Sequence, residues 1–281
     1  MIEMLKNMKY RYLLLGVIFT LALSLILLTL LGVGSPYITA IAATLSLYFF
    51  PIGWIFYHFR KHHQSFRQWL QPTRFKISET VAAVIFPELL GIGILALITL
   101  GLILALPAGG FNELPETPAT NWGLVFISSV VLAPICEELI FRGFVFNKML
   151  TRFSPAKAVI LSSVIFGALH LTTGISPTLV GMVLCVIFMK YGSLLPCMII
   201  HGLHNLAVML LKYSSSLSAD TATATELLPA DMQLLLIIGG IFIVIGLVWL
   251  VLFFRKNWHY AAEFMLRFHG AEEPLPNGAG E

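Results

Sequence analysis

Long apolar stretches separated by short polar segments dominate the chain. Eight such stretches cover residues 12–33, 37–59, 81–106, 122–141, 157–172, 175–190, 193–212 and 232–254. A helix needs about 20 apolar residues to cross a bilayer, and several of these stretches approach that length. The fifth and sixth are shorter, as in helices that are tilted, buried in protein or partly re-entrant. The pattern predicts an all-α, polytopic transmembrane helical bundle of about eight spans.

Composition agrees with a membrane protein. Hydrophobic residues make up 58% of the chain and charged residues only 11%, whereas soluble domains carry about 25% charged residues. We therefore predict a single integral-membrane domain over residues 1–270. The remaining segment, 271–281, is polar and contains proline and glycine, so it is predicted to be a disordered tail.

Basic residues predict the orientation of the bundle. Lysine and arginine are concentrated before the first apolar stretch, in residues 60–76, in residues 142–157 and after residue 254. Residues 107–121 and 213–231 contain neither. Because cytoplasmic connections carry the excess of basic residues, this alternation predicts eight spans with cytoplasmic N- and C-termini. The short loops, with no organellar transit peptide, favour a bacterial cytoplasmic membrane, with the endoplasmic reticulum as the alternative.

A few strongly polar residues interrupt the apolar stretches. Such residues are costly at membrane depth and often mark functional sites, although some are interfacial caps or interhelical hydrogen-bonding groups. The set consists of Glu88, Glu137, Glu138, Arg142, His170, His201, His204 and Asn205.

The fourth apolar stretch runs into the sequence EELIFR. Glu138 and Arg142 are four residues apart and share a helix face, so they are predicted to form an ion pair. Glu137 points about 100° away and lacks that partner. Pro134 is expected to break or restart the helix and to place Glu137 near a helix N-terminus. Two carboxylates in such different surroundings suit a division between a structural and an acid–base role.

Two further sequences, FGALH and HGLHN, carry polar groups on single helix faces. Phe166 and His170 are four residues apart, as are His201 and Asn205. An imidazole beside a carboxamide can stabilise an oxyanion, or it can contribute to a metal site. Placed in one interior cavity, these groups and Glu137 form a set typical of a hydrolase.

The three motifs resemble EExxxR, FxxxH and HxxxN of the CPBP intramembrane proteases. That family includes the CAAX prenyl endopeptidase Rce1 and bacterial Abi and bacteriocin-immunity proteins, and the resemblance covers about residues 122–212. It implies an endopeptidase that cuts near the cytosolic membrane face, with a conical cavity in a helical bundle. It also implies that Glu137 activates water with help from His170, that His201 and Asn205 form the oxyanion site, and that Glu138 and Arg142 support them.

The sequence indicates the cofactor and the partners less directly than it indicates the fold. The resemblance leaves a metal requirement open; a divalent metal such as zinc is a candidate cofactor, and its candidate ligands are Glu137, Glu138, His170 and His201. The expected partners are membrane lipid and a peptide or protein substrate, lipidated or not, and no nucleic acid. A non-catalytic membrane scaffold, peptide-binding or immunity protein is the main alternative. A small transporter is a third possibility, which the missing internal repeat disfavours.

Overall fold

The computed structural model describes residues 1–32, 36–105, 121–170, 174–219 and 229–270, and this part of the chain is helical and contains no strand. The all-α prediction is confirmed. Residues 271–281, predicted to be a disordered tail, lie outside the described residues. The helices are α1 (Ile2–Asn7), α2 (Tyr10–Leu30), α3 (Pro36–Lys61), α4 (Ile77–Ala105), α5 (Trp122–Val125), α6 (Ala133–Glu138), α7 (Asn147–Leu150), α8 (Pro155–Ala168), α9 (Ile175–Tyr191), α10 (Leu194–Ala219), α11 (Pro229–Asn257) and α12 (His259–Phe268).

Among the described residues, five helical segments are long and apolar enough to cross a membrane, as expected of an integral membrane protein. They are Tyr10–Leu30, Ile77–Ala105, Trp122–Leu150, Leu194–Ser214 and Asp231–Asn257. The fifth and sixth predicted spans correspond to α8 and α9, which are apolar but shorter, as the sequence suggested. The count of eight spans stays a prediction.

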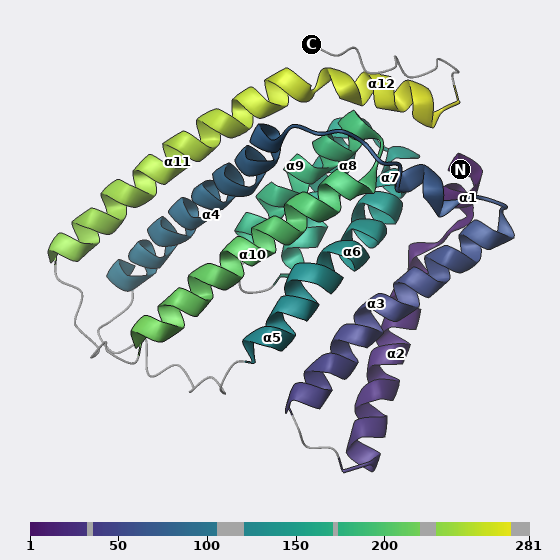
Figure 1. Ribbon diagram of the computed structural model, residues 1–281, viewed down its shortest axis with the longest axis horizontal. Coiled ribbons are helices and arrows are strands. Elements are labelled where there is room, and N and C mark those ends of the chain that lie inside the picture. Colours follow the sequence, from purple (N-terminus) through teal and green to yellow (C-terminus); the bar gives the residue numbers. More distant parts are fainter. Residues whose placement is uncertain (33–35, 106–120, 171–173, 220–228, 271–281) are drawn as a thin grey trace.

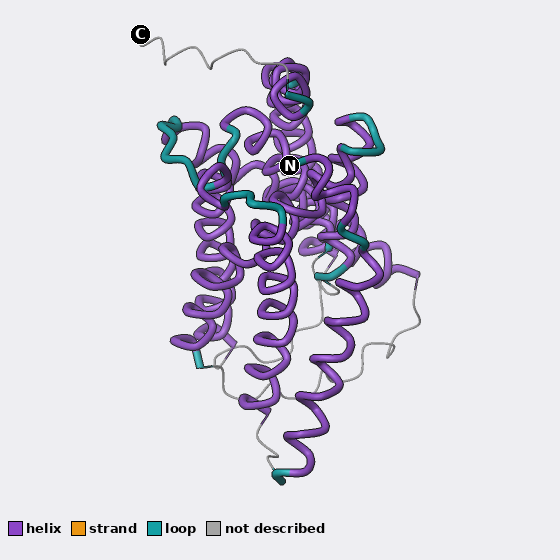
Figure 2. Tube along the Cα trace, turned by 90° about the vertical axis from the view of Figure 1, so that its right-hand side faces the viewer, coloured by secondary structure: helices purple, strands orange, loops and turns teal. Residues whose placement is uncertain are grey.

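The long helices lie side by side, and most run between the same two ends of the molecule (Figure 1). Helices α4 and α11 form one edge, the α2–α3 hairpin forms the other, and α8, α9 and α10 lie between them. Helices α1 and α12 lie at the same end, as the side view also shows (Figure 2). With an even number of spans the two ends of the chain lie on the same side of the membrane, so α1 and α12 must lie at the same end. Which side of the membrane that end faces stays a prediction.

The core centres on α9, which packs against α4, α8 and α10. Its residues from Val183 to Met189 are almost wholly buried. By contrast, α2 has no buried residue although it is apolar over most of its length. Such a helix is suited to a lipid environment, which solvates its side chains while its own backbone hydrogen bonds stay satisfied.

The helix that carries the EELIFR motif is longer than the sequence suggested. The predicted stretch ended at residue 141, whereas the helix continues from Trp122 to Leu150. Pro134 does not break it: Leu132 (φ −74°, ψ −46°) and Ala133 (φ −57°, ψ −50°) are both helical. The expectation that Glu137 lies near a helix N-terminus is therefore wrong, because Glu137 lies near the middle of the helix.

The π-helical stretch Phe126–Leu132, just before Pro134, explains this continuity, and a second π-helical stretch covers Leu139–Phe146. Proline lacks the amide hydrogen that an α-helix would use, and its ring crowds the preceding turn. A wider π-type turn just before Pro134 changes the hydrogen-bonding register there and accommodates the ring. Such π-helical segments are uncommon and often occur at functional sites.

Candidate active site

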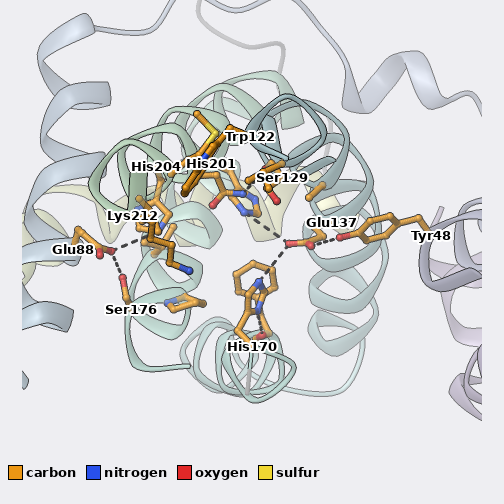
Figure 3. Close-up of a pocket in the computed structure, with 18 residues that line it drawn as sticks. Tyr48, Glu88, Trp122, Ser129, Glu137, His170, Ser176, His201, His204 and Lys212 are labelled. Atoms are coloured by element: carbon orange, nitrogen blue, oxygen red, sulfur yellow. Dashed lines mark hydrogen bonds and ion pairs between the residues drawn. The ribbon is translucent and has the colours of Figure 1, made fainter. Parts of the chain in front are cut away.

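A cavity of about 300 Å³ lies among the middle helices, and all four predicted catalytic residues line it. Glu137 comes from α6, His170 closely follows α8, and His201 and Asn205 come from α10. Figure 3 shows Glu137, His170 and His201 pointing towards one another across this space. The structure thus brings together groups from helices that are well separated in sequence.

The two supporting residues lie behind the cavity wall. Arg142 Nη1 donates to Glu138 Oε1 at 2.7 Å, and both side chains are at most 1% exposed. The guanidinium also lies 4.7 Å from the ring centroid of Phe166. The ion pair predicted from the four-residue spacing is confirmed. A charge pair buried so completely is strongly destabilised when one partner is lost.

This ion pair extends to His201. The Nδ1 atom of His201 lies 2.8 Å from Glu138 Oε1, the same oxygen that Arg142 contacts. A carboxylate oxygen only accepts hydrogen bonds, so His201 Nδ1 carries a proton. Arg142 and Glu138 therefore fix the ring of His201, and its Nε2 atom faces Glu137 at 3.7 Å from Oε2.

His170 is oriented in a similar way by its own helix. Its Nδ1 atom lies 2.8 Å from the carbonyl oxygen of Phe166, which also only accepts. In neutral His170 the lone pair is consequently on Nε2, 3.9 Å from Glu137 Oε2. The FxxxH spacing thus supplies the backbone acceptor that sets the tautomer.

The two carboxylate oxygens of Glu137 have different surroundings. Tyr48 of α3 donates its hydroxyl hydrogen to Oε1 at 2.5 Å. Oε2 faces His170 and His201 at separations too long for a direct hydrogen bond. The side chain of Glu137 is 12% exposed. One oxygen is therefore held, and the other is available to the cavity.

Asn205 lies on the same cavity wall as His201. Its Nδ2 atom donates to the carbonyl oxygen of Ser129 at 2.7 Å, and the side chain contributes to the lining of the cavity. A carboxamide nitrogen has two hydrogens, so one remains for another acceptor. Its predicted role at an oxyanion stays a prediction.

A second polar group occupies the opposite side of the cavity (Figure 3). Ser176 donates to the carboxylate of Glu88, and His204 Nε2 lies 3.5 Å from the same oxygen. Glu88 and His204 stood out in the sequence as polar residues within apolar stretches, but the contact between them was not predicted. Lys212 also lines the cavity.

Sequence reasoning missed Tyr48 and Ser176. Both lie in apolar stretches, where a tyrosine or a serine is unremarkable, and each contacts a residue nearly 90 positions away. The local sequence pattern does not predict these contacts. Only the packing of α3 against α6, and of α9 against α4, brings them to the site.

A divalent metal such as zinc stays a candidate cofactor, with Glu137, Glu138, His170 and His201 as its candidate ligands. Among the described residues, no group of three or more His, Cys, Asp or Glu side chains is placed to hold a metal ion. Of the four candidate ligands, Glu138 is fully buried and bound to Arg142 and His201.

Comparison with known proteins agrees with the three motifs. Residues 119–207 match the family model described as type II CAAX prenyl endopeptidase Rce1-like. This part of the chain is similar to that family, and we call it the Rce1-like segment. The resemblance drawn from EELIFR, FGALH and HGLHN is thereby confirmed. The search of curated proteins and the search of solved structures gave no significant match.

The Rce1-like segment contains every predicted catalytic and supporting residue. Tyr48 and Glu88 lie outside it, on α3 and α4. The family is one of proteases, which supports a hydrolase. The helices N-terminal to the segment thus add to the cavity two polar groups that the family match does not cover.

Proposed function

We propose that the protein is an intramembrane endopeptidase that hydrolyses a peptide bond near the cytosolic membrane face by a water activated by Glu137. The observation that carries this proposal is the convergence of Glu137 Oε2, His170 Nε2 and His201 Nε2 on one cavity. The Rce1-like match supports the same class of reaction.

The nucleophilic water would bind between Glu137 and His170. The 3.9 Å between Oε2 and Nε2 is well under twice a hydrogen-bond length of about 2.8 Å, so one water can reach both atoms. Both atoms accept hydrogen bonds, so the water donates its two hydrogens and keeps a lone pair for attack. Glu137 is the general base and His170 orients the water.

His201 and Asn205 would polarise the scissile carbonyl. In this proposal His201 is protonated on both nitrogens. The charges of Glu137, Glu138, Arg142 and His201 then sum to zero, which suits a buried cluster. His201 Nε2–H and the second Nδ2–H of Asn205 are the two donors to the developing oxyanion.

The reaction proceeds by addition and elimination. Glu137 takes one proton from the water while the water oxygen bonds to the carbonyl carbon, forming a tetrahedral oxyanion. The oxyanion then collapses, the carbon–nitrogen bond breaks, and Glu137 returns the proton to the leaving amine. The products are a carboxylate and an amine once the new carboxyl group has lost its proton to solvent, and the enzyme ends in its starting state.

The proposed substrate is a membrane-associated peptide or protein, lipidated or not, with membrane lipid as the surrounding partner and no nucleic acid. The apolar lining residues, which include Val125, Val180 and Val208, support an apolar segment beside the scissile bond. We place the protein in a bacterial cytoplasmic membrane, which the short loops support.

The test compares wild-type protein with Glu137→Gln and with Glu263→Gln, a control that removes an exposed carboxylate on α12. Each is purified in detergent, checked for its melting temperature, and incubated with lipidated and unlipidated peptides whose fragments are identified by mass spectrometry. We expect wild type and control to cut at the same bonds and Glu137→Gln to lose at least about 100-fold in rate. A chelator series in the same assay measures whether a divalent metal is required.

Two results would overturn the proposal. Equal cleavage by wild type and Glu137→Gln would mean that Glu137 is not the base. Binding of peptides by all three proteins with cleavage by none would instead favour the non-catalytic binding or immunity function.

A further inference from the structure

A second cavity lies away from the active site, where the N-terminal segment meets the end of the helix that carries Glu137. Its volume is about 330 Å³. Five of its lining residues are basic, and they come from two regions far apart in sequence: Lys6, Lys9, Arg11, Lys148 and Arg152. Proposed catalysis at Glu137 uses none of them.

These five cations have no anionic partner within the part of the chain that the structure describes. No aspartate or glutamate is among the residues that line the cavity. Within the described part of the chain, none of the five forms an ion pair, and Arg11 instead donates to the hydroxyl of Tyr12. Like charges gathered around one space repel one another. A bound anion would relieve that repulsion.

Lys148 provides a second and independent indication. Its side chain is buried, with the residue 2% exposed, and its ammonium donates to the carbonyl oxygens of Leu5 and Lys6. It also lies 5.7 Å from the ring centroid of Tyr10. The carbonyl groups orient this ammonium but bring no full negative charge, and a buried cation without an anion is costly.

The position of the cavity indicates which anion it would meet. Tyr10 begins α2, the candidate span that has no buried residue and so faces lipid. Tyr10 and Tyr12 lie at the end of that span, where aromatic residues mark the membrane interface. Phosphate groups of lipids lie at this depth, and basic residues there bind anionic headgroups.

We propose that this cavity binds the phosphate-bearing headgroup of an anionic phospholipid, held between the start of α2 and the residues that follow α7. The lipid would bridge Lys9 and Arg11 to Arg152 and neutralise the field around Lys148. It would tie the N-terminal segment to the helix that also carries Glu137 and Arg142. The proposal does not depend on the proposed protease activity.

The experiment measures the melting temperature of the full chain in detergent while lipid is added. Phosphatidylglycerol, phosphatidylcholine and inorganic phosphate are titrated separately. The test variant is Lys9→Gln with Arg152→Gln, two exposed cavity residues. The control is Arg74→Gln with Lys157→Gln, which removes the same charge from exposed positions outside the cavity. Native mass spectrometry counts the bound lipid.

We expect a saturable rise in melting temperature with phosphatidylglycerol only, because binding to the folded state stabilises it. The test variant should bind about 30-fold more weakly, since each basic residue near an anionic headgroup contributes roughly a fivefold factor. The control should bind as the wild type does.

Three results would overturn the proposal. A similar rise with phosphatidylcholine would show that the headgroup charge does not matter. An equal loss in the test and control variants would show a general effect of basic surface charge. A rise with inorganic phosphate that matches the lipid would indicate a small-anion site. The first and third arms use wild-type protein, so they remain decisive if the variant does not fold.

Discussion

At the scale of single residues, the contact between Tyr48 and Glu137 makes the sharpest prediction. Tyr48 donates to Oε1 of Glu137, whereas the proposed nucleophilic water binds at Oε2, so Tyr48 is a positioning residue that leaves Oε2 to the cavity. A hydrogen bond to a charged group is worth about 1.5–3 kcal/mol. We expect Tyr48→Phe to lower kcat about tenfold or more while KM stays unchanged, measured with the peptide identified by the cleavage assay.

The matched control is Tyr57→Phe. Tyr57 lies on the same helix but is exposed, and it contacts His58 and Lys61 rather than the site. The prediction would fail if both variants lost activity alike, or if Tyr48→Phe raised KM instead of lowering kcat. A general loosening of α3 would lower the melting temperature of both variants, whereas loss of the hydrogen bond to Glu137 should lower only that of Tyr48→Phe, by several degrees.

Residue patterns predicted some contacts of this site and not others. The Glu138–Arg142 pair follows from helix geometry, because residues four apart share a face whatever the rest of the fold does. The same logic placed Phe166 with His170. The contact of His201 with Glu138 joins different helices, so it depends on how α10 packs. Local rules therefore predict contacts between residues of one helix, but they do not predict contacts between residues of different helices.

At the scale of elements, the close approach of α8 and α9 sets the position of His170. Gly167 allows it: a Cβ there would lie 1.8 Å from Thr178 Oγ1 and 2.5 Å from the carbonyl oxygen of Gly174. We expect Gly167→Ala to push the helices apart at a cost of about 1–3 kcal/mol. Because His170 follows Gly167 closely in the chain, kcat should fall together with the melting temperature.

Gly101→Ala is the control for this substitution. Gly101 lies in α4, and a Cβ there would meet no atom within 4 Å. Alanine favours helix more than glycine does by about 1 kcal/mol, so this variant should melt at or slightly above the wild-type temperature with full activity. Equal melting temperatures for the two alanine variants would show that α8 and α9 accommodate the added methyl group, and the prediction would be wrong.

Element boundaries were harder to predict than the elements themselves. The apolar stretch 122–141 correctly indicated a helix, but the helix extends to Leu150 because its last turns are buried by protein rather than lipid. Asn147 and Lys148 are polar yet almost fully buried there. Hydropathy marks where a helix could meet lipid, so it cannot mark the end of a helix that continues inside the protein.

At the scale of the whole molecule, hydropathy predicted the architecture because a bilayer leaves a chain few alternatives. The apolar stretch 232–254 corresponds to α11, and 193–212 corresponds to the first part of α10. Composition could not predict that the α2–α3 hairpin lies at one edge of the bundle, nor that its residue Tyr48 nevertheless lines the cavity. The candidate active site is accordingly built by the segment that matches the family model and completed by helices that precede it.

The orientation of the whole bundle gives the last prediction. With eight spans and cytoplasmic termini, α1 and α12 should face the cytoplasm, and the start of α5 at the opposite end should face outward (Figure 1). We expect cysteines introduced as Glu3→Cys and Glu263→Cys to react with a membrane-impermeant maleimide only after cells are opened. Asn121→Cys should react in intact cells.

The parent chain, whose cysteines are buried or half-buried, measures background labelling. Reaction of Glu3→Cys and Glu263→Cys from opposite sides would require an odd number of spans. Reaction of both in intact cells would invert the bundle and contradict the orientation that the basic residues predict.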